Sequence, residues 1–509
     1  MSEDNGVVTL FRAAVVACAV VAGAGLLAPE ILNSTASALM SGVLRSLDWF
    51  FMGASTGFLL LCLWLALSPH GEIKLGQPDD EPEFSTISWL AMLFSAGMGA
   101  GLLFWGVAEP MTHFSDPPIG APSTTDAARQ AMILTNFHWG LHAWAIYGVA
   151  AMALAYFGFR HETPNLPGAP IRATFVGKWV EPVAKGADFI AIVAVVFGVA
   201  GSLGMGIMQV HTGLHIATGI PEQSMLVQTA ILVTLVICYM LSAATSLDEG
   251  IKWLSNLNMT LVVVLLLFLL LVGSTPFLLR TYVTSVGDYA SSIVGLSFQM
   301  YPFVEVQEWL HNWTLTYFIW WIAWAPFVGV FIARISRGRT IREFVLGVLL
   351  APTAFSILWF AIFGGSAFHL EMEGSGGVTR LVQEDMTQAL FHVYDSMPLS
   401  MVLSLVTVFL VFVFLVTSAD SATFVLSMMT SDGSMDPPRK RKLTWGIVLA
   451  GMGAALLFTK NIQMMRAVVI SGAFPFTLIL LLQLGAFVRK LHDDNHQERN
   501  DGDEGGARE

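Results

Sequence analysis

Residues 95–110 read SAGMGAGLLFWGVAEP, and residues 313–331 read WTLTYFIWWIAWAPFVGVF. Both stretches are apolar enough to cross a membrane, yet the first is rich in glycine and the second contains Pro326 and Gly329. A spanning helix must satisfy its own backbone polar groups, so interruptions at membrane depth are tolerated only against protein or a water-lined cavity. The two stretches therefore predict interrupted helices around a cavity. Close helix packing through small residues is the alternative for the glycines.

The composition of the whole chain points to a membrane. Of its 509 residues, 55% are hydrophobic and 12% charged, whereas roughly 25% are charged in soluble proteins. Residues 259–279 and 401–419 contain no charged side chain, and each has about the 20 residues that a spanning helix needs. The net charge of −12 makes nucleic acid an improbable partner. The three cysteines lie in apolar segments and predict neither disulfides nor a thiolate metal site.

A hydropathy scan with a window of about 19 residues predicts an all-α membrane protein with twelve helices. They lie near residues 9–29, 47–68, 86–108, 130–157, 187–210, 224–246, 255–279, 313–334, 344–368, 399–429, 442–459 and 466–488. With both termini inside, most of the 25 Lys and Arg residues fall on the inner side, including the loops 333–344 and 437–443. The positive-inside rule thus favours cytoplasmic N and C termini.

Helices 3–7 and 8–12 form two groups of five. Because five is odd, the groups sit inverted in the membrane, and corresponding interrupted helices in inverted halves point to a transport site near the bilayer midplane. The organisation we predict is the N-terminal helices 1–2 (1–85), a first inverted repeat (86–281), an outer surface helix with a connector (282–312), a second inverted repeat (313–490) and a disordered cytoplasmic tail (491–509).

Aromatic residues gather on one face of helix 8. At 100° per residue, Trp313, Trp320 and Trp324 fall within about 40° of one another, with Tyr317 just beyond and Trp321 at the margin. A methylated ammonium has no N–H to donate, but aromatic ring faces can hold it at about 0.5–2 kcal/mol per contact. An aromatic packing seam between helices is the alternative. Helix 4 adds three further aromatics, namely Trp139, Trp144 and Tyr147.

Helix 10 contains polar residues in an apolar run, FLVTSADSATF from Phe414 to Phe424. Hydroxyl and freed carbonyl oxygens are ligands that suit a hard cation such as Na⁺, although Ser and Thr often only bond back to their own helix. Asp420 is a functional candidate because a carboxylate in a bilayer is costly, and a structural tie between helices is equally plausible. His138 and His142 have metal-binding spacing, but no third ligand accompanies them, which argues against a metal.

Four longer strings carry a family resemblance. Residues 71–110, GIKWLSNLNM (250–259), WAPFVGVFIARISRGRTIREF (324–344) and VTSADSATFVLSM (416–428) together resemble the betaine/choline/carnitine transporter family over about residues 8–490. The resemblance implies twelve helices, a 5+5 inverted repeat of the leucine-transporter type in helices 3–12, and alternating access. It also implies a homotrimer formed through the surface helix.

The resemblance also implies site residues. The substrate-binding residues would be Trp320, Trp321, Trp324, Met98, Gly101, Trp139, Trp144 and Tyr147. The sodium ligands would be backbone carbonyls of Ser95, Met98 and Phe414 with the hydroxyls of Thr417 and Ser418. Choline carriers of the family tend to have an aspartate at the position of Gly101, so glycine favours a zwitterion. Helix 7 lacks the basic residue of sodium-independent exchangers.

Some residues depart from the family pattern. Phe318 and Ile319 replace the commoner Trp-Ala, and Gly201 stands where a hydroxyl residue is usual, which leaves the Na⁺ stoichiometry open. The short acidic tail does not predict tight osmotic activation. We expect a Na⁺-coupled symporter in a bacterial plasma membrane that imports a methylated zwitterion, glycine betaine first and a sulfonium analogue or ectoine next. We expect no cofactor, and we expect Na⁺ to act as the coupling ion. A choline or carnitine carrier and a non-transporting solute sensor are the rivals. An enzyme is disfavoured because no nucleophile, metal or nucleotide motif is present.

Overall fold

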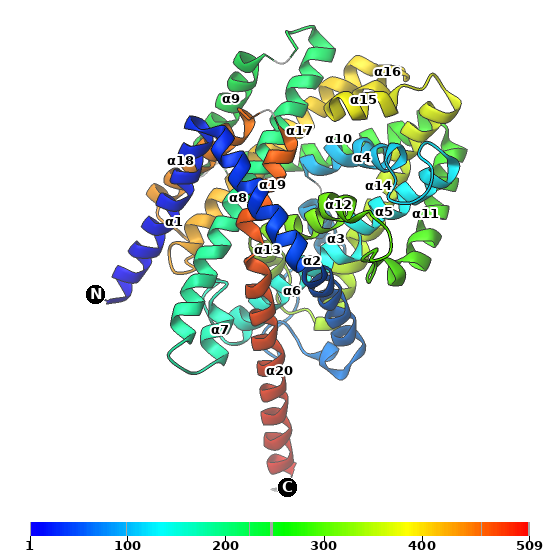
Figure 1. The fold of residues 1–509 in the computed structure, drawn as a ribbon. Coiled ribbons are helices and arrows are strands. Elements are labelled where there is room, and N and C mark those ends of the chain that lie inside the picture. Colours follow the sequence, from blue (N-terminus) through cyan, green and yellow to red (C-terminus); the bar gives the residue numbers. More distant parts are fainter. Residues whose placement is uncertain (1, 98, 223, 245–247, 460, 507–509) are drawn as a thin grey trace.

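The computed structural model describes residues 2–97, 99–222, 224–244, 248–459 and 461–506 (Figure 1). Over these residues the protein is helical, and the only extended pairing within them is one isolated bridge between Lys74 and Thr340. The predicted all-α class is therefore confirmed.

The first half of the chain contains ten α-helices, one π-helical turn and the 3-10 turn Pro69–Glu72 among its described residues. They are α1 (Ser2–Leu27), α2 (Pro29–Leu67), α3 (Thr86–Gly97), α4 (Ala100–Ser115), α5 (Thr125–Trp139), α6 (Leu141–Ala155), the π-turn Tyr156–Arg160, α7 (Ala169–Thr174), α8 (Val180–Thr218), α9 (Met225–Ala244) and α10 (Asp248–Val272).

The second half begins with the helix expected on the outer surface, which starts at Thr275 rather than near residue 282. Its described elements are α11 (Thr275–Leu296), α12 (Gln307–Leu310), the π-turn His311–Leu315, α13 (Thr316–Ile335), α14 (Ile341–Glu373), α15 (Val378–Asp385), the 3-10 turn Met386–Gln388, α16 (Ala389–Asp395), α17 (Ser400–Met429), α18 (Arg439–Leu457), α19 (Ile462–Ala473) and α20 (Phe476–Gly506).

Ten helices of the described chain are long and apolar enough to cross a membrane. Two of the twelve predicted segments fall short of that measure, although both are helical. Segment 86–108 is divided into α3 and α4, and segment 442–459 corresponds to α18, which begins with the basic residues RKRK. The twelve spans and the 5+5 repeat remain predictions.

The predicted fourth helix contains a break that we did not predict from its sequence. The helix stops at Trp139 and resumes at Leu141, and Gly140 between them has non-helical angles (φ −96°, ψ −141°). Tyr289 of α11 fills the gap, since its hydroxyl oxygen accepts a hydrogen bond from the Leu141 N–H at 2.8 Å. A Cβ at Gly140 would lie 2.4 Å from that hydroxyl oxygen. Glycine is therefore required for the contact.

The predicted interruption of the eighth helix is wrong. The helix α13 runs without a break from Thr316 to Ile335, through Pro326 and Gly329. Proline is tolerated in membrane helices where neighbouring helices and local adjustments satisfy the freed backbone groups. Gly329 serves packing, because a Cβ there would lie 3.1 Å from the Cβ of Ala150 in α6. Of the two predicted interruptions, the described residues show the one in the third helix, where Gly99 has extended backbone angles (φ −137°, ψ 179°) before α4.

The predicted disorder after Leu491 also differs from the structure, in which α20 continues to Gly506. In Figure 1 this helix projects beyond the other helices toward the C terminus. Its extension is anchored by Asp494, whose Oδ2 accepts a hydrogen bond from the Tyr156 hydroxyl at 2.6 Å and lies 2.8 Å from His161 Nε2. Lys490 adds an ion pair one helical turn earlier. These contacts hold α20 as far as Asp494.

The centre of the bundle is formed by α6, α8, α13 and α17 (Figure 1). α13 packs against α6 and α8, and α17 packs against α8. α8 presents small residues to its neighbours. A Cβ at Gly206 would lie 2.6 Å from a Leu415 methyl of α17, and one at Gly201 would lie 2.5 Å from a Val469 methyl of α19. The small residues thus bring the central helices close enough to enclose a cavity.

Candidate functional site

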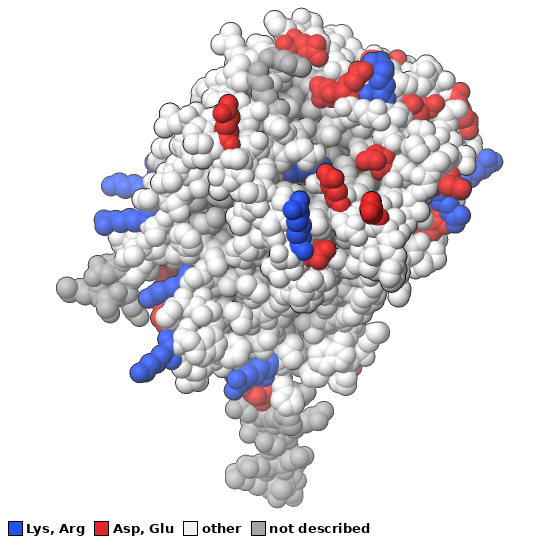
Figure 2. Space-filling view, viewed as in Figure 1, with Lys and Arg blue, Asp and Glu red and all other residues white. Residues whose placement is uncertain are grey.

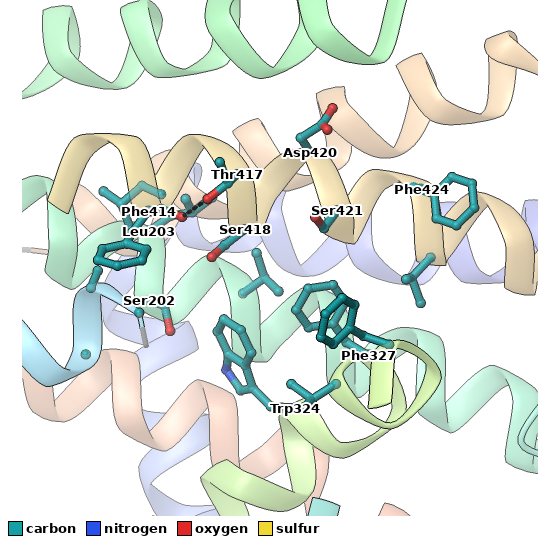
Figure 3. Close-up of a pocket in the computed structure, with 18 of the residues that line it drawn as sticks. Ser202, Leu203, Trp324, Phe327, Phe414, Thr417, Ser418, Asp420, Ser421 and Phe424 are labelled. Atoms are coloured by element: carbon teal, nitrogen blue, oxygen red, sulfur yellow. Dashed lines mark hydrogen bonds between the residues drawn. The ribbon is translucent and has the colours of Figure 1, made fainter. Parts of the chain in front are cut away.

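A cavity of about 1020 Å³ lies between α4, α6, α8, α13 and α17. Figure 3 shows part of it, with the indole of Trp324 and the ring of Phe327 on one side and the hydroxyls of α17 on the other. Such a concave site, mostly apolar with a few polar groups, is typical of small-molecule binding.

Aromatic rings from five helices line the cavity, and those predicted from the sequence come from α5, α6 and α13. α13 contributes Trp320, Trp321 and Trp324, which are spaced so that all three reach the same hollow. α5 contributes Trp139, and α6 contributes Trp144 and Tyr147. The sequence-predicted aromatic residues are therefore together in space.

The rings meet edge to face. Trp321 is at the junction, with its ring centroid 5.0 Å from that of Trp139 and 5.8 Å from that of Tyr147. Trp144 lies 5.7 Å from Tyr147. Trp313, which we expected on the same face of the eighth helix, instead packs against His113 at 4.5 Å and is not part of the cavity wall. Trp313 nevertheless stacks on Tyr317, with ring centroids 6.3 Å apart, and Arg466, which lines the cavity, lies over its ring.

The interrupted third helix borders the same cavity through Gly99 and Gly101. A Cβ at Gly101 would lie 3.3 Å from Cη2 of Trp139, so this glycine faces an indole of the pocket. Met98 lies outside the described residues, and Ser95 is placed only as a member of the last turn of α3. At this break the cavity is therefore bordered by the backbone of Gly99 and Gly101 rather than by side chains.

The hydroxyl-rich turn of α17 forms the opposite wall. Phe414, Thr417 and Ser418 all line the cavity. The Thr417 hydroxyl donates to the carbonyl oxygens of Val413 at 3.1 Å and Phe414 at 3.2 Å. Figure 3 shows the Ser418 hydroxyl directed toward Trp324 across the hollow, whereas the carboxylate of Asp420, which also lines the cavity, points away from Trp324. Two side-chain oxygens and one carbonyl oxygen thus lie within one turn of helix.

A buried polar cluster, which the sequence did not predict, closes one end of the cavity. It consists of Glu109, His113, His138 and Tyr317, and the Glu109 and His138 side chains are fully buried. Beside it the Arg466 guanidinium carbon lies 4.7 Å from the ring centroids of both Trp105 and Trp313. His138 contacts Glu109 rather than His142, so the pairing suggested by their spacing is not formed. No local sequence signal links Glu109 to His138, which is 29 residues away.

The other end of the cavity reaches charged residues. Arg334 at the end of α13 lines it, as do Asp436, Arg439 and Lys442 near the start of α18. These residues belong to the stretches that we predicted as cytoplasmic loops. The cavity is therefore continuous from the rings to the basic end of the bundle and closed by the Glu109 cluster at the other.

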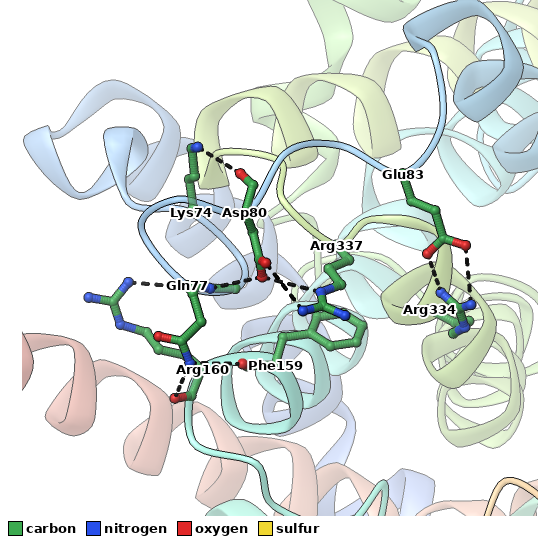
Figure 4. Close-up of polar contacts among 9 residues, drawn as sticks. Lys74, Gln77, Asp80, Glu83, Phe159, Arg160, Arg334 and Arg337 are labelled. Atoms are coloured by element: carbon green, nitrogen blue, oxygen red, sulfur yellow. Dashed lines mark hydrogen bonds and ion pairs between the residues drawn. The ribbon is translucent and has the colours of Figure 1, made fainter.

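The loop between α2 and α3 (residues 68–85) runs along this basic end (Figure 4). Asp80 accepts hydrogen bonds from Arg337 at 3.2 Å, and Glu83 accepts one from Arg334 at 2.6 Å. These hydrogen bonds hold the pKa of Asp80 and that of Glu83 below their usual values. The loop that leads into α3 is thus joined by ion pairs to the C-terminal end of α13 and the residues just after it.

Comparisons of the sequence with known proteins identify one family of transporters. The sequence matches the BCCT model, described as betaine/carnitine/choline family transporter, over residues 9–496. It is 43% identical over 475 residues to the glycine betaine transporter OpuD of Bacillus subtilis (strain 168), covering 93% of this chain and 92% of that one. It is 40% identical to the ectoine/hydroxyectoine transporter of Virgibacillus pantothenticus, covering 98% and 99% of the two chains. The solved structure of MhsT in complex with L-phenylalanine aligns over 79% of this chain and 89% of that one, with 14% identity and a TM-score of 0.46.

Proposed function

We propose that this chain, which belongs to the betaine/carnitine/choline family of transporters, carries a methylated zwitterion, with glycine betaine as first choice, together with Na⁺. The family resemblance predicted from four motifs is confirmed, and the chain is a multi-pass membrane transporter of compatible solutes rather than an enzyme. The identity of the solute, the coupling to Na⁺ and the inward direction of transport are what we propose.

The observation that carries the proposal is the aromatic wall of the cavity. Trp139, Trp321, Trp324 and Tyr147 present rings to one hollow. A quaternary ammonium cannot donate a hydrogen bond through its nitrogen, but ring quadrupoles attract it at about 0.5–2 kcal/mol per contact. Several rings around one site favour this class of solute over a primary amine or a sugar.

Two further features favour a zwitterion over choline. Gly101 faces the Trp139 ring without a carboxylate of its own, and the Glu109 carboxylate behind that ring already accepts hydrogen bonds from Trp139 and Tyr317. A full cation, by contrast, needs its charge balanced in a site of low dielectric constant. The relatives named as glycine betaine and ectoine transporters are consistent with this ranking. A choline or carnitine carrier is the rival within the family.

Sodium coupling is supported by the oxygen atoms of α17. The Thr417 hydroxyl already contacts the Phe414 carbonyl oxygen at 3.2 Å, and Ser418 lines the cavity beside it. These are hard oxygen ligands of the kind that Na⁺ prefers. The site that we propose combines them with carbonyls of the interrupted third helix, at Ser95 and Met98. Gly201 argues against a second site that needs a hydroxyl there, because any Cβ would lie 2.5 Å from Val469.

We propose an inner-membrane location with both termini cytoplasmic. In the view of Figure 2, acidic residues gather over the upper part of the molecule, and basic residues are prominent along its lower left edge. The positive-inside rule places the basic edge in the cytoplasm. On this orientation the cavity opens inward, and alternating access requires a second state in which the Glu109 end opens.

The trimer remains a proposal that rests on α11. Its side chains Val283 and Val294 are both 70% exposed, and Phe298, just after the helix, is 63% exposed. On its other side, Asp288 pairs with Arg129 of α5. The helix is thus fixed to its own subunit and presents an apolar face outward, which suits contact with a second copy.

The experiment that tests the function uses liposomes containing the purified full-length protein. Labelled glycine betaine, ectoine, choline and carnitine are each offered with and without an inward Na⁺ gradient. We expect glycine betaine to accumulate most, and only with the gradient. Choline uptake equal to or above that of glycine betaine would overturn the ranking, and equal uptake without Na⁺ would overturn the coupling. Binding in detergent without accumulation would identify the non-transporting sensor instead.

A further inference from the structure

A buried carboxylate stands directly behind the aromatic wall. Glu109 of α4 is 0% exposed. Its Oε2 accepts a hydrogen bond from the indole N–H of Trp139 at 2.7 Å, and a second one from the Tyr317 hydroxyl. Its Oε1 lies 2.7 Å from Nδ1 of His138. Groups from α5 and α13 are therefore fixed by one side chain of α4.

His138 extends this arrangement to another indole. An ionised Glu109 only accepts hydrogen bonds, so His138 Nδ1 is the donor, and Nε2 on the other side of the ring lies 2.9 Å from the Thr314 hydroxyl. The His138 ring stacks on Tyr317 with centroids 4.9 Å apart. The backbone carbonyl of His138 accepts a hydrogen bond from the Trp321 indole N–H at 2.8 Å. Glu109 thus holds Trp139 directly. It holds Trp321 indirectly, because His138 contacts Glu109 through its side chain and Trp321 through its backbone carbonyl.

Holding the N–H edge of an indole decides which part of the ring faces the cavity. Trp139 and Trp321 both line the cavity, and their rings meet edge to face at 5.0 Å. The attraction of a cation to a ring depends on approach to the face rather than the edge. An unanchored indole that turned about its side-chain bonds would offer the wrong part of the ring. A binding site works best when the partners of its contact residues lock them in place.

We propose that Glu109 is a positioning residue of the transport site: it does not touch the solute, but it fixes the ring faces of Trp139 and Trp321 on which the cationic group rests. The ligand atoms of Glu109, His113 and His138 also lie within 4.8 Å of one another, close enough for a metal ion. The hydrogen bonds from Trp139, Tyr317 and His138 occupy the Glu109 oxygens, and they favour the positioning role. The inference rests on the proposed function, because the solute is the one proposed above.

The test compares three variants of the full-length protein by calorimetric titration with glycine betaine. Glu109→Ala removes the acceptor and is expected to raise Kd at least about tenfold. Glu109→Gln is expected to stay within about threefold of wild type, because its amide oxygen accepts from Trp139 and its NH₂ group donates to His138 in the other tautomer. The matched control is Asp188→Asn, another buried carboxylate, which bonds to Arg172 and the Gly168 N–H. Its Kd should not change.

A second measurement does not need the solute. The near-ultraviolet circular dichroism difference between wild type and Trp139→Phe isolates the signal of the anchored indole. Glu109→Ala is expected to lose that signal, and Glu109→Gln to keep it. If wild type binds no glycine betaine, the proposed function fails, while this spectrum still tests the anchoring.

Three results would overturn the inference. The first is a folded Glu109→Ala protein with wild-type Kd or an unchanged indole signal. The second is a Glu109→Gln protein as weak as Glu109→Ala, since charge rather than position would then matter. If Glu109→Ala does not fold, Trp139→Phe removes the N–H end of the same contact and is expected to raise Kd at least about threefold; an unchanged Kd is the third.

Discussion

Trp324 offers the cleanest test of the aromatic wall. It lines the cavity, and its indole N–H, which is buried, has no hydrogen-bond partner. Replacing it by Leu therefore removes a ring face without breaking a hydrogen bond. One cation–ring contact contributes about 0.5–2 kcal/mol, which corresponds to about a 2- to 30-fold increase in Kd. Trp321→Leu should cost about 0.5–1.5 kcal/mol more, because the Trp321 N–H donates to the His138 carbonyl oxygen.

Calorimetric titration of the purified protein with glycine betaine measures both variants. The control is Trp253→Leu on α10, whose side chain is 66% exposed on the outside of the bundle and should have no effect on Kd. An unchanged Kd in Trp324→Leu would refute the role of this ring. An equal loss in Trp253→Leu would show that the effect is not specific to the cavity.

Three other predictions concern different parts of the molecule. Gly101→Asp places a carboxylate in the cavity and should raise choline uptake relative to glycine betaine; paired uptake assays measure the ratio, and an unchanged ratio contradicts the argument. Arg337 lowers the pKa of Asp80, so this contact should be complete at neutral pH and lost only as the pH falls below about 4. Limited proteolysis should cut the 68–85 loop at pH 7 in Arg337→Ala but not in wild type, and equal cutting would refute it. Asp288→Ala leaves Arg129, whose side chain is 65% exposed, in solvent and should lower the free energy of unfolding by at most about 1 kcal/mol; a larger loss in chemical denaturation would contradict the view that the exposed arginine limits the strength of this ion pair.

Patterns within one helix were predictable from the sequence. The apolar spans follow from hydropathy, and the meeting of Trp320, Trp321 and Trp324 follows from their spacing along α13. The glycine-rich interruption of the third helix was also found, because glycine weakens a helix wherever it stands. These features depend on neighbours a few residues apart.

Features that depend on distant residues were missed or misjudged. The helix breaks at Gly140 because Tyr289, which is 149 residues later in the chain, accepts a hydrogen bond from the Leu141 N–H. The continuity of α13 through Pro326 depends on packing against α6. The Glu109 cluster joins three helices, and an acidic residue beside a proline gives no sign of its partners. Each of these contacts requires the assembled bundle.

The size of the cavity has a consequence for the energy of the transport cycle. A hollow of about 1020 Å³ has room for roughly 30 water molecules at the volume each occupies in the liquid. A state that closes around a small solute must return most of them to bulk, so the open–closed equilibrium depends on water activity by mass action. For about 30 waters the shift is only roughly 0.3 kcal/mol per osmolal of solute. Dehydration of this cavity alone would therefore make the open–closed equilibrium respond only weakly to external osmolality.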